Sequence, residues 1–109
     1  MKVVRADEAV PYDPPGHRGV DARRLQQLAG LTVSVSTYEQ GGAVTELPTA
    51  ADTVYVVLAG TLRVTSHDDG ACVDLGVHDS VFLRAGETRS VVNVSDADAV
   101  LLVVLGGAP

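Results

Sequence analysis

Three histidines and one cysteine carry the strongest transition-metal donors of this chain, and their spacing decides whether they can share an ion. His17 lies in a proline-rich segment, while His67 and His78 lie in expected turns. No two of them are spaced as i, i+2 in a strand or i, i+4 in a helix, the spacings that direct two imidazoles at one metal. We therefore expect no metal centre built from them, and interpret His67 and His78 as solvated turn residues. The lone Cys72 excludes an internal disulfide and a cysteine-based zinc site, and we expect it to be a small buried hydrophobe.

The composition favours one β-rich domain. Apolar residues make up 46% of the 109 residues, and twenty of them are valine, whose β-branched side chain suits strands. The formal net charge is −6 and the eight basic residues are scattered, which disfavours nucleic-acid binding. The longest apolar run, 99–105, is far shorter than the roughly 20 residues of a membrane-spanning helix. Acidic residues near the amino terminus do not fit a signal peptide, so we expect a cytoplasmic protein with no membrane partner.

Residues 1–30 are expected to form an N-terminal extended arm on an all-β domain of residues 31–109. The prolines within 11–17 exclude regular structure there, while 21–30 could form one or two helical turns or an edge strand. From Leu31 the apolar pattern has period two. It predicts strands over 31–38, 52–58, 61–66, 71–77, 81–84, 90–94 and 99–105. We expect Gly41–Gly42 to end the first strand and 67–70 to form a hairpin turn, in a β-sandwich or barrel.

Two stretches resemble the sequence motifs of the cupin family. The first cupin motif is Gly, five residues, His-x-His, three or four residues, Glu, six residues, Gly; here Gly41 and Gly60 bound it with the spacing kept. The second is Gly, five residues, Pro-x-Gly, two residues, His, three residues, Asn. It retains Gly86 and Asn93, whereas His78 replaces its first glycine and Arg84 replaces its proline. The resemblance covers about residues 31–105 and implies a cupin double-stranded β-helix, or jelly-roll, barrel.

All four metal-ligand positions of these motifs carry other residues. Leu47 and Thr49 replace the first two histidines, Thr53 the glutamate and Arg89 the last histidine. Leucine has no donor, threonine is a poor neutral ligand, and arginine keeps its proton and charge. The resemblance therefore implies a metal-independent cupin, for which we expect no cofactor.

By the same correspondence, Leu47, Thr49, Thr53 and Arg89 should converge inside the barrel, with Tyr55 on the face of Thr53. A guanidinium in an apolar cavity suits a carboxylate, an enolate or another oxyanion of a small-molecule ligand. The alternatives are that Arg89 pairs with Glu39, Glu46 or Asp52, or reaches the rim, and a contribution of His17 stays open. The candidate catalytic residues are Arg89, Tyr55 and Tyr38, and the candidate ligand contacts are Leu47, Thr49, Thr53, Asn93 and Phe82.

Two functions stay open. The resemblance to small cyclase-like cupins implies a metal-free isomerase, dehydratase or cyclase acting on an oxygenated carbonyl compound such as a polyketide-like intermediate. Arg89 would stabilise an enolate, while a tyrosine or a rim carboxylate of Glu39 or Glu46 would transfer protons. The alternative is a non-catalytic cupin that senses or carries a small anionic or aromatic molecule. A homodimer is expected, because short barrels leave sheet edges that residues 3–20 of a partner could cover.

Overall fold

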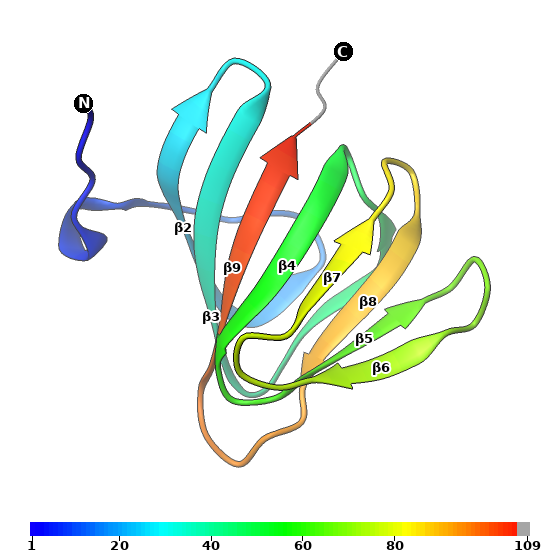
Figure 1. Ribbon diagram of the computed structural model, residues 1–109. Helices are drawn as coiled ribbons and strands as arrows, with labels where there is room; N and C mark the ends of the chain where they lie inside the picture. Colours follow the sequence, from blue (N-terminus) through cyan, green and yellow to red (C-terminus); the bar gives the residue numbers. More distant parts are fainter. Residues whose placement is uncertain (107–109) are drawn as a thin grey trace.

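The computed structural model describes residues 1–106, and strands dominate them (Figure 1). A short 3-10 helix, η1 (Ala6–Glu8), precedes the sheet. The strands are β1 (Val10–Tyr12), β2 (His17–Leu28), β3 (Leu31–Pro48), β4 (Asp52–Ala59), β5 (Leu62–Ser66), β6 (Cys72–Leu75), β7 (Ser80–Leu83), β8 (Thr88–Asn93) and β9 (Ala99–Gly106). Within the described residues, no helix is long and apolar enough to cross a membrane.

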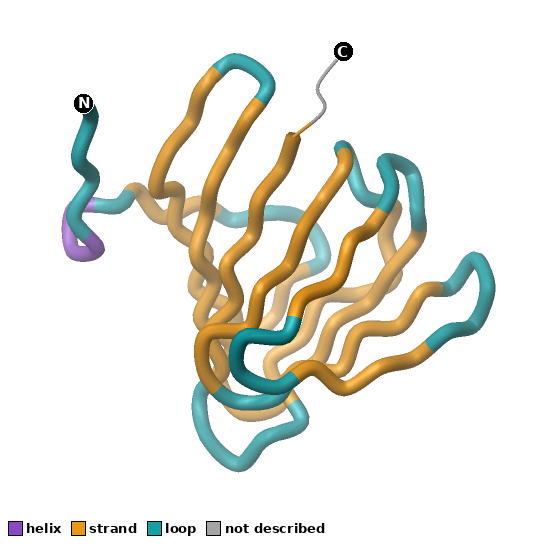
Figure 2. Tube along the Cα trace, viewed as in Figure 1, coloured by secondary structure: helices purple, strands orange, loops and turns teal. Residues whose placement is uncertain are grey.

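One antiparallel sheet folds into a nearly closed barrel, as the tube in Figure 2 shows. Its strand order is β6-β5-β8-β3-β9-β4-β7, with β2 along β3 and β1 on β2. The long β3 belongs to two layers, because 31–38 pair with β9 whereas 43–48 pair with β8. This architecture confirms the all-β class and the jelly-roll barrel that the glycine spacing implies.

The expected break at Gly41–Gly42 is a bend within β3. Residues 39–42 lie opposite the single residue Gly19, where the register of β2 and β3 shifts. A Cβ on Gly42 would collide with the backbone oxygen of Gly19, so the close approach of the two strands requires glycine there. The bend carries β3 from one layer to the other and thereby curves the barrel.

The N-terminal segment is more regular than predicted. Residues 17–28 form β2, a strand that pairs with β3 on one side and with β1 on the other, so the helical alternative is wrong. β2 exchanges ladder hydrogen bonds with β3, which outweighs the helix propensity of the sequence 22–28. Pro11 lies within β1, which pairs with β2 of the same chain. β1 is an edge strand, so a residue without a backbone N–H is tolerated there.

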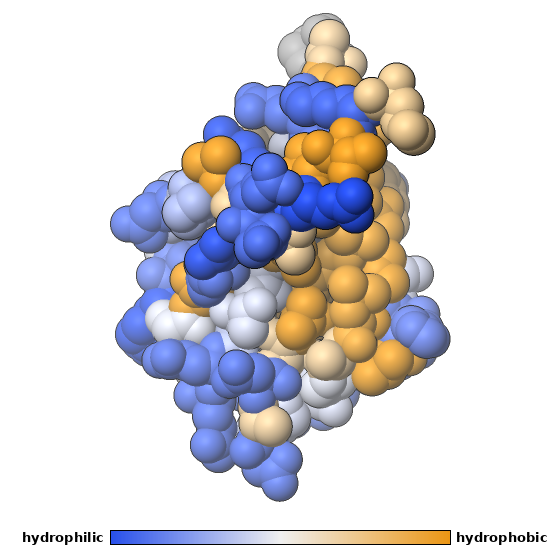
Figure 3. Space-filling model, turned by 90° about the vertical axis from the view of Figure 1, so that its left-hand side faces the viewer, coloured by the Kyte–Doolittle hydropathy of each residue, from blue (hydrophilic) through white to orange (hydrophobic). Residues whose placement is uncertain are grey.

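Successive side chains of each strand point alternately to the inner face and to the outer face of the barrel. On the surface, apolar residues gather along one side of the molecule (Figure 3). The inner positions form the core, in which Tyr38, Val57, Leu62 and Leu101 are almost fully buried.

The segment 67–70 forms the predicted hairpin turn between β5 and β6, with Gly70 at a positive φ of 76°. Cys72 contradicts its prediction, because it lies on the exposed edge strand β6 rather than in the core.

Candidate functional site

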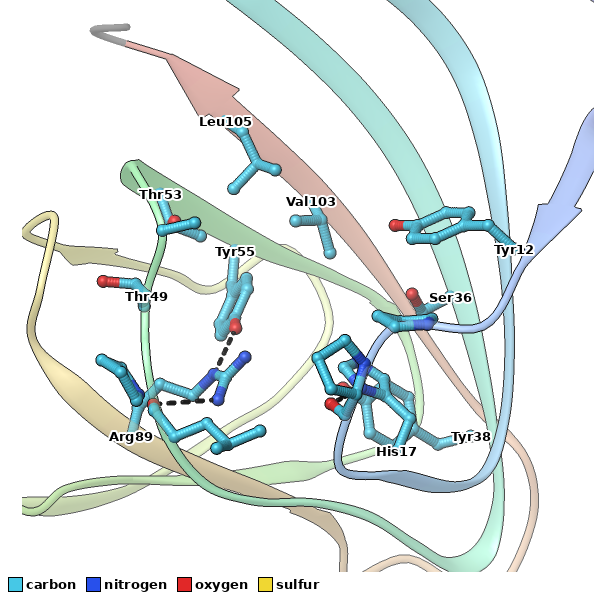
Figure 4. Close-up of a pocket in the computed structure, with 15 residues that line it drawn as sticks. Tyr12, His17, Ser36, Tyr38, Thr49, Thr53, Tyr55, Arg89, Val103 and Leu105 are labelled. Carbon is cyan, nitrogen blue, oxygen red and sulfur yellow. Dashed lines mark hydrogen bonds between the residues drawn. The ribbon is translucent and has the colours of Figure 1, made fainter. Parts of the chain in front are cut away.

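A cavity of about 220 Å³ opens on the inner face of the barrel, between β3, β4, β8, β9 and the loop that precedes β2 (Figure 4). Val103 and Leu105 of β9 contribute apolar wall to it. Its volume is below the roughly 300–1,000 Å³ of sites for drug-sized ligands, so it suits a molecule of about one ring. Six of the predicted site residues line it, namely Tyr38, Leu47, Thr49, Thr53, Tyr55 and Arg89.

Arg89 is half-buried in this cavity and is held by two hydrogen bonds. Its Nε donates to the Tyr55 hydroxyl at 2.9 Å, and its Nη1 donates to the Leu47 carbonyl at 3.1 Å. Within residues 1–106, no carboxylate forms an ion pair with it. Pairing with Glu39, Glu46 or Asp52 is therefore wrong. The Glu46 Oε2 lies 3.7 Å from the His67 Nδ1, and the Asp52 Oδ1 accepts a hydrogen bond from the Ala85 amide at 3.0 Å.

The donors at the cupin ligand positions do not fit a metal ion. The hydroxyl of Thr49 donates to the Arg84 carbonyl at 2.6 Å, and that of Thr53 donates to the Ala51 carbonyl at 2.8 Å. A neutral hydroxyl is a weak metal ligand, Leu47 has no ligand atom in its side chain, and the Arg89 guanidinium places a positive charge where the ion would lie. His17 alone supplies a good ligand atom among the described wall residues.

His17 reaches the cavity because the loop before β2 folds over the barrel opening. Its Nδ1 lies 3.0 Å from the Pro15 carbonyl, which can only accept, so Nδ1 carries the proton and Nε2 holds the lone pair. Burial lowers the pKa of His17; the Pro15 hydrogen bond acts in the opposite direction, and the Arg89 charge lowers the pKa further. The imidazole is consequently neutral at pH 7 and is a possible proton acceptor.

Ser36 and Tyr38 form a second polar group in the cavity wall. Both residues are more than nine-tenths buried, and both line the cavity. Burial raises the pKa of Tyr38, so its phenol remains a neutral donor. Sequence reasoning missed Ser36, although its position two residues before Tyr38 in a period-two strand places both on one face.

The structure does not bring the last two predicted contacts, Asn93 and Phe82, into the cavity. The Asn93 amide donates to the backbone carbonyls of Tyr38, Glu39 and Ala97 at 2.8–3.2 Å, and its oxygen accepts from Ser95. Asn93 therefore fastens the β8–β9 loop to β3. Phe82 is 57% exposed and pairs with Val54 on the outer face, because successive strand positions point to opposite sides.

The other two histidines stay apart from the cavity. His67 is exposed in the predicted turn, and its Nε2 lies 2.8 Å from the Ser90 hydroxyl oxygen. His78 is exposed and adopts a positive φ of 70°, the conformation that the glycine of the second motif would supply. No group of three or more His, Cys, Asp or Glu side chains within residues 1–106 is placed to hold a metal ion.

Fold and site together define a small β-barrel protein with a buried cavity and altered ligand positions. Residues 34–105 match the family model described as the cupin domain, and the chain belongs to the cupin family. A curated relative, "Beta-D-galactosidase Rv1717" of Mycobacterium tuberculosis, is 46% identical over 110 residues, which cover 96% of this chain and 93% of the relative.

Solved structures agree on the fold. The polyketide cyclase RemF of Streptomyces resistomycificus superposes with a TM-score of 0.83 at 18% identity, over 99% of this chain and 80% of that one. KdgF of Halomonas sp. superposes with a TM-score of 0.82 at 15% identity, over 99% and 96% of the two chains. At these identities the likeness shows a shared fold.

Proposed function

We propose that this cupin binds a sugar-like molecule of about one ring in the barrel cavity and cleaves a glycosidic bond to it without a metal. The observation that carries the proposal is that a phenol, a guanidinium and a neutral imidazole line one cavity, from Tyr55, Arg89 and His17. The relative that is 46% identical is named a β-D-galactosidase, which makes a galactoside the first substrate to test. Apolar walls with a few placed polar groups are typical of such small-molecule sites.

The site lacks the usual glycosidase machinery. Most glycosidases use two carboxylates, one as acid and one as base or nucleophile. No Asp or Glu of residues 1–106 lines this cavity, so other groups must move the protons. The Tyr55 oxygen accepts a hydrogen bond from Arg89, which leaves its own O–H free to donate, while Nε2 of His17 can accept.

These roles give a balanced hydrolysis. His17 Nε2 removes a proton from water as the water oxygen attacks the anomeric carbon, and the glycosidic C–O bond breaks. The leaving oxygen takes the Tyr55 proton, and the Arg89 N–H stabilises the phenolate that forms. Transfer of the proton from His17 back to Tyr55 through solvent restores both groups. The products are the free sugar and the alcohol.

A second reaction class is favoured by the absence of a carboxylate from the described cavity wall. His17 or Tyr55 could remove a proton next to a carbonyl, and Arg89 would stabilise the resulting enolate, as isomerisation, dehydration or cyclisation requires. In this case the ligand is an oxygenated carbonyl compound and no glycosidic bond is cleaved.

Hydrolysis of methyl β-D-galactoside, followed as released galactose, tests the proposal because its leaving oxygen must be protonated; methyl β-D-glucoside is the comparison substrate. We expect Tyr55→Phe and His17→Asn to lower kcat by about 100-fold or more, the usual contribution of a general acid or base. Arg63→Ala and His78→Asn are matched controls, because both side chains are exposed and distant from the cavity, and they should retain activity.

The outcomes separate the candidate functions. Galactose binding measured by calorimetry without hydrolysis would support the non-catalytic binding cupin. Turnover of a carbonyl compound without hydrolysis would support the enolate reaction. If neither galactose nor the galactoside binds or reacts, the sugar proposal is wrong.

A further inference from the structure

Arg89 has donor capacity that the protein itself does not use. A guanidinium offers five N–H donors, of which two are engaged with Tyr55 and the Leu47 carbonyl, so three remain without a partner within residues 1–106. The side chain is half-buried in a cavity whose described wall carries no acidic residue. A partly desolvated cation without a counter-charge is unfavourable, so the cavity favours a ligand that brings a negative charge.

Two nearby groups show that the Arg89 charge extends across the cavity. Burial is the main cause of the lowered pKa of His17, and the Arg89 charge lowers that pKa further. Burial raises the pKa of Tyr38, and the Arg89 charge acts in the opposite direction. Both residues line the same cavity (Figure 4). An anion bound at Arg89 would therefore lie in a positive field with low dielectric around it, where charge-assisted hydrogen bonds are strong.

The opposite part of the cavity has a different character. Ser36 and Tyr38 contribute neutral hydroxyl-bearing side chains to its wall, and both residues are more than nine-tenths buried. Figure 4 shows them on the β3 side, across the cavity from Arg89 and Tyr55. Hydroxyls in a cavity wall can donate hydrogen bonds to the hydroxyls of a ligand and accept hydrogen bonds from them.

We infer that the ligand is an acidic sugar, whose carboxylate binds Arg89 while its ring hydroxyls bind Ser36 and Tyr38. This inference rests on the proposed sugar-binding function and names the substrate class. Bidentate binding of a carboxylate needs two adjacent N–H groups, and the free donors of Arg89 include both on Nη2 and one on Nη1.

Calorimetric titration of the wild-type protein with D-galacturonate and with D-galactose tests the inference directly. We expect galacturonate to bind at least about tenfold more tightly, and the preference to shrink as salt is raised. Arg89→Gln should abolish the preference, whereas Arg63→Gln, the matched exposed arginine, should preserve it. Equal affinities for the two sugars would overturn the acidic-sugar inference and leave the proposed function standing. Failure of both to bind would overturn the proposed function as well.

Discussion

Replacing Asn93 by alanine tests whether this residue is structural rather than a ligand contact. Its amide donates to three backbone carbonyls from β3 and the β8–β9 loop. Truncation leaves the buried Tyr38 carbonyl unpaired, at a cost of about 1–3 kcal/mol, and removes two further bonds of about 1 kcal/mol each. The sum is about 3–5 kcal/mol. For a chain of 109 residues this lowers Tm by about 13–22 °C at the usual unfolding entropy per residue.

The assay is thermal unfolding followed by circular dichroism, together with ligand titration below the transition. Asn93→Asp should destabilise at least as much, because a carboxylate oxygen would replace the amide donor and face the same three carbonyls. Both variants should bind the wild-type ligand with unchanged affinity while they remain folded. An Asn93→Ala protein that melts within a few degrees of the wild type but loses ligand binding would refute the structural role.

Three further changes follow from local geometry. The pKa of His17 is lower in the folded protein than its ordinary value of about 6.5, so the unfolded chain binds more protons just below that pH. The free energy of unfolding should therefore rise with pH in this window, and denaturant titrations should show a flatter profile for His17→Gln. His78→Gly should raise stability by about 0.5–1 kcal/mol in thermal melts, since a left-handed φ is costly for other residues. Gly60→Ala should destabilise by about 2–3 kcal/mol in the same assay, because φ is 75° and the new Cβ would lie 2.8 Å from the Ala99 Cβ.

The strand pattern and the glycine spacing were sufficient to predict the barrel and part of its cavity. Alternation with period two fixes which side of a strand each residue faces, and this places Thr53 and Tyr55 on one wall. The motif spacing likewise aligned Leu47 and Arg89, which pair directly between β3 and β8. These relations are local or follow a known register, so the sequence alone determined them.

Long-range packing decided the remainder. Nothing local indicates that His17 folds over the cavity, because its position depends on β2 pairing with β3 around the bend at Gly42. The same pairing converted the helix-favouring segment 21–28 into a strand. The Asn93 amide donates to the carbonyls of Tyr38 and Glu39, which lie 55 and 54 residues away in sequence. A local sequence pattern does not predict such contacts. The lack of an acidic partner for Arg89 within residues 1–106 is likewise a tertiary fact, since it depends on where every carboxylate of a folded chain comes to lie.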